Sequence, residues 1–138
     1  MPSELPPELA ALIAQAVEAS DRAYVPYSGF RVGAALRVAG GEVIRGCNVE
    51  NASYGLTICA ERVAVATAVA AGHREFEAIA IHVDGPDGQP CGACRQVLAE
   101  LAPGVVVVYR SGGAYVVSST GQLLPDGFGP AALDRTPA

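Results

Sequence analysis

Apolar residues recur at two spacings along the chain, and these spacings predict its helices and strands. After a pair of prolines, residues three and four positions apart are apolar, at Leu9, Leu12, Ile13, Ala16 and Val17. Helices are predicted over residues 9–22, 59–71 and 92–101. Gly72 follows the second helix, and a Pro-Gly pair follows the third, so both have clear stop signals.

Runs of β-branched and other apolar residues predict the strands, over residues 30–39, 42–48, 76–84, 105–109 and 115–118. Gly40 and Gly41 form a good two-residue hairpin turn between the first two strands. The resulting order of elements predicts one α/β domain over residues 1–138. We expect three layers, α/β/α, with helices on both faces of a five-stranded mixed sheet.

The predicted helix from residue 59 is small and apolar on every side after Arg62. A helix without a polar face is normally buried all round, which a small single domain cannot easily achieve. A subunit interface would supply the missing cover, because exposed apolar patches usually mark contacts. The alternative is a helix sandwiched between the sheet and the first helix, with its alanines partly exposed.

Composition and charge restrict the partners of this chain. Its 138 residues are 51% hydrophobic, but no apolar run approaches the roughly 20 residues of a membrane span. Residues 1–8 hold two acids, three prolines and no basic residue, so we expect no targeting signal and a cytoplasmic location. The net charge is −5 and basic residues are scattered, which favours a small-molecule substrate over a nucleic acid.

Three cysteines lie in two short motifs that suit a metal ion. Cys91 and Cys94 are three residues apart at the start of a predicted helix, and Cys59 opens another. One helical turn brings Cys91 and Cys94 to the same side, and helix N-termini favour thiolates. Three thiolates can bind one Zn²⁺ per chain and leave its fourth tetrahedral position open for catalysis.

Glu61 is the candidate catalytic residue beside this cluster. At the first turn Cys59 can stay outside the helical register, so its side chain and that of Glu61 can converge. The alternative is a glutamate that is merely favourable near a helix N-terminus. Arg62 and Arg95 also adjoin the cluster in sequence, and a guanidinium that donates to a thiolate would offset its charge. Otherwise both arginines are solvated surface charges.

The fourth cysteine, Cys47, decides whether the zinc site stays open. Strand alternation places Cys47 and Val49 on one face, and Asn48 and Glu50 on the other. If Asn48 and Glu50 face the site, Cys47 points into the core as a small hydrophobe.

Four motifs occur in a fixed order along the chain, namely YSGFRVGAA (27–35), NVENASY (48–54), TICAER (57–62) and PCGACRQ (90–96). Together they resemble the motifs of the cytidine deaminases of the small homotetrameric zinc type, and the likeness spans about residues 23–128. One departure is Gln122, where the family usually has glutamate before Leu-Leu-Pro.

The resemblance implies the cytidine deaminase-like fold and a role for each matching residue. Cys59, Cys91 and Cys94 would bind zinc, and Glu61 would shuttle protons while zinc-activated water attacks C4 of cytidine or 2′-deoxycytidine. The products would be ammonia and uridine or 2′-deoxyuridine, as in pyrimidine salvage. Residues expected to bind substrate are Phe30 at the pyrimidine, Ala60 at its O2 through the backbone N–H, Asn48 and Glu50 at the ribose, and Tyr54 and Phe128 at a neighbouring subunit's site.

Two other functions remain open from the sequence. One is a deaminase of the blasticidin-S type, although Phe30, Asn48 and Glu50 favour a nucleoside substrate. The other is a non-enzymatic zinc module, which would need a fourth ligand to close the metal site.

Overall fold

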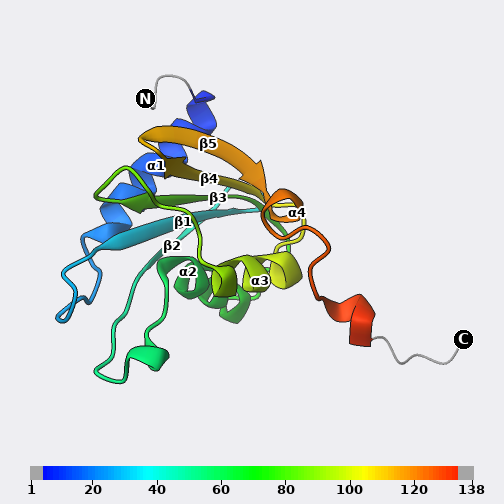
Figure 1. The fold of residues 1–138 in the computed structure, drawn as a ribbon. Coiled ribbons are helices and arrows are strands. Elements are labelled where there is room, and N and C mark those ends of the chain that lie inside the picture. Colours follow the sequence, from blue (N-terminus) through cyan, green and yellow to red (C-terminus); the bar gives the residue numbers. More distant parts are fainter. Residues whose placement is uncertain (1–4, 134–138) are drawn as a thin grey trace, which may run out of the picture.

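A five-stranded sheet organises the fold of residues 5–133, the part of the chain that the computed structural model describes (Figure 1). The strands are β1 (Val32–Val38), β2 (Val43–Cys47), β3 (Phe76–Val83), β4 (Val106–Ser111) and β5 (Ala114–Ser119). The helices are α1 (Pro7–Ser20), α2 (Ala60–Ala70), α3 (Gly92–Leu101) and α4 (Thr120–Leu123), with short 3₁₀ turns at η2 (Tyr54–Leu56) and η3 (Pro130–Leu133).

The strands lie in the order β2-β1-β3-β4-β5. β1 is antiparallel to both β2 and β3, β3 and β4 are parallel, and β5 returns antiparallel to β4. The parallel pair needs a crossover connection, which α3 supplies. The predicted five-stranded mixed sheet is therefore confirmed.

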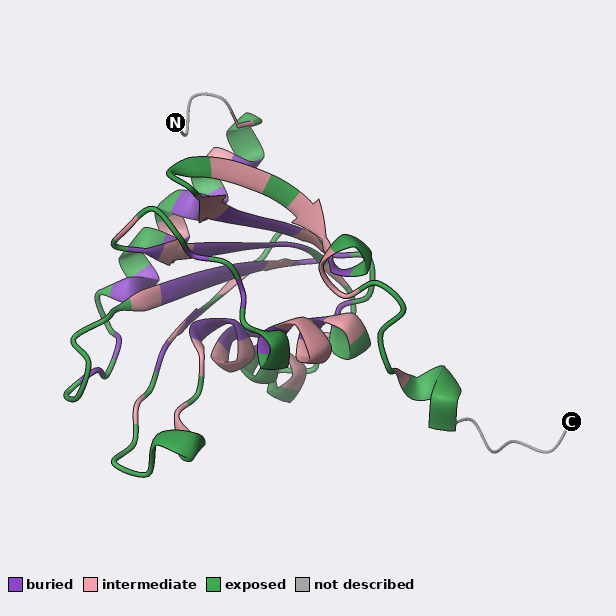
Figure 2. Cartoon of the chain, in the orientation of Figure 1, coloured by how far each residue is buried: buried purple, intermediate pink, exposed green. Residues whose placement is uncertain are grey.

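The two faces of the sheet carry different helices, which gives three layers (Figures 1 and 2). Strand alternation assigns the core residues to the two faces. On one face, α1 packs against small residues of the central strands, with a cluster formed by Leu9, Leu12, Ile13, Ala16, Ala35, Ala78, Ala80 and Val108. On the other face, α2 and α3 cover larger side chains, in a cluster that includes Leu36, Ala64, Val65, Ile79, Ile81, Leu98 and Val107.

Helix α2 is buried on one side only within this chain. Ala64, Val65 and Ala68 are fully buried, whereas Ala66 and Thr67 are exposed. The expected burial on every side is therefore not found in the single chain. Nor is α2 sandwiched between the sheet and α1, because these two helices lie on opposite faces.

Several local features differ from the sequence prediction. The first helix ends at Ser20 rather than near residue 22, and β1 begins at Val32. The short elements η2, α4 and η3 were not predicted, because three or four residues are too few to show a periodic pattern. Within residues 5–133, no helix combines the length and apolar character needed to cross a membrane.

Two glycines allow the helices to approach the sheet closely. A Cβ at Gly46 of β2 would lie 2.5 Å from both the Ala60 carbonyl oxygen and the Ala64 nitrogen of α2. At Gly33 of β1, a Cβ would lie 2.0 Å from the carbonyl oxygen of Ala16 in α1. Because these neighbours are backbone atoms, a larger residue at either position must displace a helix.

We expect Gly46→Ala to destabilise the protein by about 1–3 kcal/mol, the usual cost of overpacking a tight contact. It should also lower zinc content, because α2 begins beside the cysteine cluster. Gly121→Ala is the matched control, since its Cβ would meet nothing within 4 Å. Chemical unfolding and elemental analysis measure both effects, and a Gly46→Ala protein as stable as the control would contradict this account of the packing.

Candidate active site

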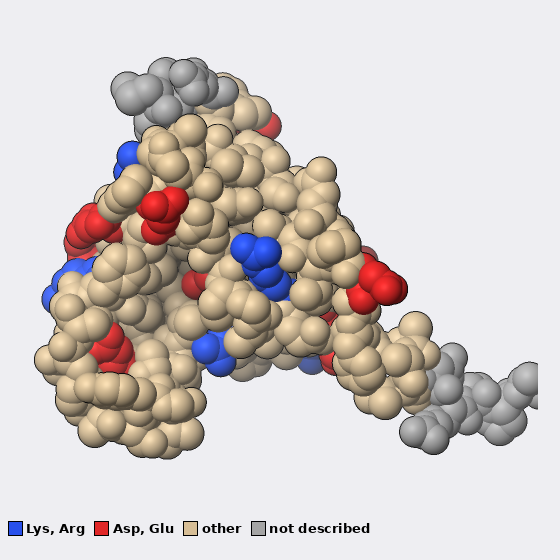
Figure 3. All heavy atoms as spheres, in the orientation of Figure 1, with Lys and Arg blue, Asp and Glu red and all other residues tan. Residues whose placement is uncertain are grey.

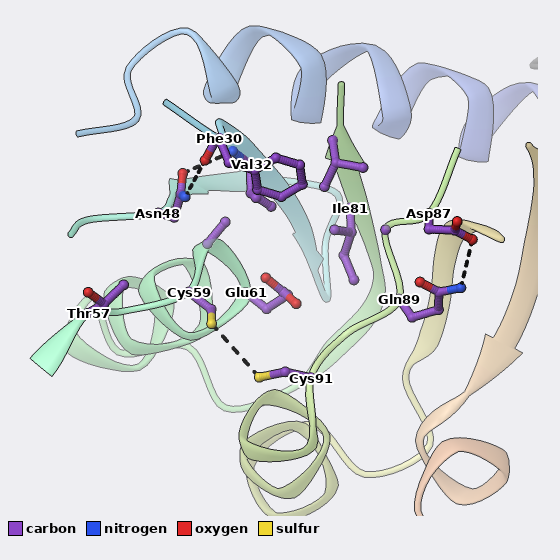
Figure 4. A pocket seen from close by; sticks show the side chains of 13 residues that line it. Phe30, Val32, Asn48, Thr57, Cys59, Glu61, Ile81, Asp87, Gln89 and Cys91 are labelled. Atoms are coloured by element: carbon purple, nitrogen blue, oxygen red, sulfur yellow. Dashed lines mark hydrogen bonds between the residues drawn. The ribbon is translucent and has the colours of Figure 1, made fainter. Parts of the chain in front are cut away.

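A hollow of about 260 Å³ lies where strands β1 and β3 meet the start of α2 and the segment that precedes α3 (Figure 4). Its lining includes six of the residues singled out from the sequence, namely Phe30, Asn48, Cys59, Ala60, Glu61 and Cys91. The segments that supply them are distant in sequence, so this hollow is a product of the fold.

The three predicted ligands come together at the edge of the hollow. The sulfur of Cys91 lies 3.8 Å from that of Cys59 and 3.4 Å from that of Cys94, and all three lie within 4.8 Å of one another. Zn–S bonds of about 2.3 Å in a tetrahedron place sulfurs about 3.8 Å apart. The donor set therefore fits one Zn²⁺, with three ligands from this chain.

Local helix geometry explains this convergence. Cys59 is the N-cap of α2, with extended backbone angles (φ −70°, ψ 153°), so it stays outside the helical register as expected. Cys91 is the N-cap of α3, and its sulfur accepts a hydrogen bond from the Cys94 backbone N–H at 3.5 Å. Two helix N-termini thus direct their partial positive charges at the sulfurs.

Arg62 supplies a full positive charge at the same place. Its Nη2 donates to the sulfur of Cys59 at 3.4 Å, as expected for a residue that offsets thiolate charge. Hydrogen bonds from Cys94, and next from Arg62, lower the pKa of Cys59, whereas the bond to Cys59 and burial raise the pKa of Cys94. The two thiols are therefore affected in opposite directions, with the pKa of Cys59 lowered and that of Cys94 raised.

Within residues 5–133, Arg95 donates its hydrogen bonds to backbone carbonyls rather than to a cysteine sulfur. Its Nε donates to the Pro90 carbonyl at 2.8 Å, and its Nη1 donates to the Leu123 carbonyl at 3.1 Å. The expectation that Arg95 donates to a thiolate is therefore wrong, as is the alternative of a solvated charge. Arg95 instead ties the segment before α3 to α4.

Glu61 is a buried acid that faces the hollow. Its residue is only 4% exposed, and Figure 4 shows its carboxyl group directed into the hollow beside Cys59. Burial is the main cause that raises its pKa above the ordinary value, and the nearby charge of Cys59 acts in the same direction. A carboxylate with a raised pKa is a stronger base than one in water, which suits proton transfer.

Cys47 lies away from the cluster. The described residues include one group of potential metal ligands of this kind, and it contains Cys59, Cys91 and Cys94 but not Cys47. Cys47 is half-buried and lines a separate depression between α1, β2 and α2, so the prediction that it packs in the core is wrong. The result argues against a closed four-cysteine module.

Asn48 holds the backbone that carries Phe30. Its Oδ1 accepts from the Val32 N–H at 2.9 Å, and its Nδ2 donates to the Phe30 carbonyl at 2.8 Å. The residue is 8% exposed. Since an amide offers two N–H groups and two lone pairs, one of each remains available to a ligand.

Glu50 and Tyr54 line a second hollow of about 340 Å³. Thr57 contributes to both hollows, so they adjoin. Tyr54 is 75% exposed, and its ring contacts that of Tyr27 edge to face, with centroids 6.0 Å apart. The two hollows together fall within the volume typical of small-molecule sites, about 300–1,000 Å³.

Phe128 lies outside both hollows of its own chain. It is 61% exposed, and its carbonyl accepts a hydrogen bond from Gln96 Nε2 at 2.8 Å. Its surroundings are α3 and α4 rather than the cysteine cluster. A role for this ring at a substrate would therefore require a neighbouring subunit.

The sequence analysis missed the segment that closes the far side of the first hollow. Asp87 and Gln89 line it, and Asp87 Oδ1 accepts from Gln89 Nε2 at 3.1 Å and from the Gly112 N–H at 2.9 Å. The only signal in the sequence was the position of these residues just before Cys91. Their contact with the β4–β5 turn is tertiary and leaves no pattern along the chain.

An α/β/α fold with three converging sulfurs beside a buried carboxyl group defines a zinc-binding class of enzyme. Residues 7–110 match the sequence model described as the cytidine and deoxycytidylate deaminase zinc-binding region. The chain belongs to this family of zinc-binding deaminases.

Individual relatives agree with this assignment. A cytidine deaminase of Halalkalibacterium halodurans is 51% identical over 120 residues, which cover 85% of this chain and 91% of that protein. The crystal structure of a Burkholderia pseudomallei cytidine deaminase shares 53% identity at a TM-score of 0.80, covering 86% of this chain and 97% of the other. A blasticidin-S deaminase of Bacillus cereus is 32% identical over 103 residues, 68% of this chain and 74% of that protein. The higher identities favour the cytidine deaminases.

Replacing one cysteine at a time tests the ligand set. We expect Cys94→Ser to lose most of its zinc, because only two thiolates would remain, whereas Cys47→Ser should retain one zinc per chain. Elemental analysis of the purified variants measures both. Zinc loss in Cys47→Ser with retention in Cys94→Ser would contradict the assignment.

Proposed function

We propose that this enzyme hydrolyses cytidine and 2′-deoxycytidine to uridine and 2′-deoxyuridine, with release of ammonia. The observation that carries the proposal is the buried carboxyl group of Glu61, which faces the same hollow as the sulfurs of Cys59 and Cys91. The names of the relatives at 45–51% identity support the choice of substrate.

Cys59, Cys91 and Cys94 would hold the zinc ion. When bound, zinc supplies Lewis-acid chemistry that makes water a good nucleophile near neutral pH. Arg62 donates to the Cys59 sulfur, so it withdraws some of the negative charge that would otherwise weaken this effect.

Glu61 would move the protons of the reaction. It would take one from the attacking water and deliver it to N3 of the pyrimidine. It would then take the remaining proton from the new C4 hydroxyl, which becomes the carbonyl, and transfer it to the amine that leaves C4. Burial keeps its pKa raised, so the carboxyl group can accept and return a proton within one turnover. Overall, one water is consumed and one ammonia is released.

Neighbouring groups would orient the pyrimidine and the sugar. Ala60 lies in the first turn of α2, where backbone N–H groups have no partner within the helix, so its N–H could donate to the pyrimidine O2. The ring of Phe30 would pack on the base. Asn48, through its remaining N–H and lone pair, and Glu50, from the adjoining hollow, would bind the ribose.

We further propose that the enzyme is a homotetramer with sites shared between subunits. Support comes from the exposed small residues of α2 and from aromatic side chains that the single chain leaves uncovered. Tyr54 and Phe128 would then reach the site of a neighbouring subunit.

We also propose that residues 1–138 form a single catalytic domain. Its role would be pyrimidine salvage in the cytoplasm. Figure 3 shows the arginines of one face as separate spots rather than a continuous basic surface. With a net charge of −5, this distribution supports a small nucleoside over a nucleic acid or a membrane as the partner.

Glu61→Ala tests the proton shuttle. We expect it to keep its fold and zinc but to lose about 10²–10⁴-fold in kcat, the range for removal of a general acid–base. Glu100→Ala, at an exposed acid of α3, is the matched control and should keep full activity. Ammonia release and the ultraviolet change of cytidine measure turnover, and near-normal activity of Glu61→Ala would refute the assigned role.

Light scattering tests the assembly. We expect a particle of four 14.0 kDa chains. Ala66→Glu, on the exposed side of α2, should dissociate it because a charge would be buried at the interface. Ala14→Glu, at an exposed alanine of α1, is the control and should remain tetrameric. A monomeric wild-type protein would refute the proposed assembly.

A further inference from the structure

The loop between α1 and β1 holds the carboxyl group of Glu50 by three hydrogen bonds. The backbone N–H groups of Tyr27 and Ser28 donate to its Oε1 at 3.0 and 3.2 Å. The hydroxyl of Ser28 donates to its Oε2 at 2.5 Å. Glu50 follows Ser28 by 22 residues, so these bonds join two separate segments of the chain.

This arrangement leaves a defined acceptor free. A carboxylate oxygen has two lone pairs, so the two backbone N–H groups occupy Oε1, while Oε2 keeps one free lone pair. The hydroxyl of Ser28 is the main cause that lowers the pKa of Glu50, and the two N–H groups add to it. Glu50 is therefore held as an ionised hydrogen-bond acceptor at the edge of the second hollow.

The same hydroxyl also fixes the start of the segment that carries Phe30. While it donates to Glu50, the Ser28 oxygen accepts from the Phe30 N–H at 2.9 Å. Asn48 holds the other side of the same residue through the Phe30 carbonyl. One serine thus connects an acid of the second hollow with an aromatic residue of the first.

We propose that Ser28 is a positioning residue, which orients Glu50 so that its free Oε2 lone pair accepts a hydrogen bond from a sugar hydroxyl of the substrate. This inference rests on the proposed function, because it needs a nucleoside in the two adjoining hollows. It deepens that function by naming the residue that holds Glu50, already proposed to bind the ribose, in a fixed orientation at the second hollow.

Substrate pairs and a double-mutant cycle test this role. For Ser28→Ala, we expect kcat/KM for cytidine to fall about tenfold, mainly through KM, because a charge-assisted hydrogen bond of this kind contributes at least that factor. With 2′,3′-dideoxycytidine, which lacks the 2′- and 3′-hydroxyl donors, the loss should shrink to the part that comes from the bond to the Phe30 N–H. In a Glu50→Ala background, Ser28→Ala should likewise add clearly less than its tenfold loss, because the bond to Glu50 is already gone and only the bond to the Phe30 N–H is left to lose.

Two further variants separate positioning from stability. Ser28→Thr keeps the hydroxyl and should restore most of the cytidine activity. Ser118→Ala is the matched control, since it removes a serine hydroxyl that also makes one side-chain hydrogen bond, to Gln122 on the far edge of the sheet. Thermal unfolding of all variants checks that Ser28→Ala folds normally.

The possible outcomes distinguish this inference from the function on which it rests. If the wild-type protein releases no ammonia from cytidine, the proposed function fails and the role of Ser28 fails with it. If the wild type is active but the Ser28→Ala loss is equal for cytidine and the dideoxynucleoside, or persists in full without Glu50, only the role of Ser28 is overturned.

Discussion

The site depends on bringing three sulfur atoms within 4.8 Å of one another, an arrangement that charge repulsion opposes. At 4 Å, two unit charges interact by about 4 kcal/mol at an effective dielectric constant of 20. Arg62 and the N-termini of α2 and α3 offset this repulsion with positive charge. The N-termini of α2 and α3 must therefore lie beside the sulfurs to offset their charge. The close contact at Gly46 allows α2 to take this position.

The same helix start that presents Cys59 also buries Glu61. A carboxyl group that is 4% exposed loses hydration, and its raised pKa reflects that cost. Packing alone would favour an apolar residue there, since Ala64, Val65 and Ala68 surround the core side of the same helix. A buried carboxyl group beside a metal-binding cluster is typical of a functional site, because packing alone would not select it.

Much of the fold and the metal cluster could be predicted from the sequence because their signals are local. Strand alternation and cysteine spacing at helix starts depend on a few neighbouring residues, and the sheet and the Cys59, Cys91 and Cys94 cluster follow from them. The partners of Arg95 and the location of Cys47 could not be predicted, because each depends on how separate elements pack. For Cys47, strand alternation correctly placed the side chain on the face opposite Asn48. It could not show that this part of the face is an open depression rather than core.

If Glu50 binds the sugar, its charge affects the choice between a free nucleoside and a polynucleotide more strongly than the net charge of −5 does. Charges scattered over the surface are screened beyond about 8 Å at physiological salt, so the overall balance acts weakly at any one contact. A phosphate group on the bound hydroxyl would instead meet the Glu50 carboxylate directly, and the two negative charges would repel each other. On the proposed role of Glu50, a carboxylate oriented by Ser28 and two backbone N–H groups therefore disfavours polynucleotides relative to free nucleosides.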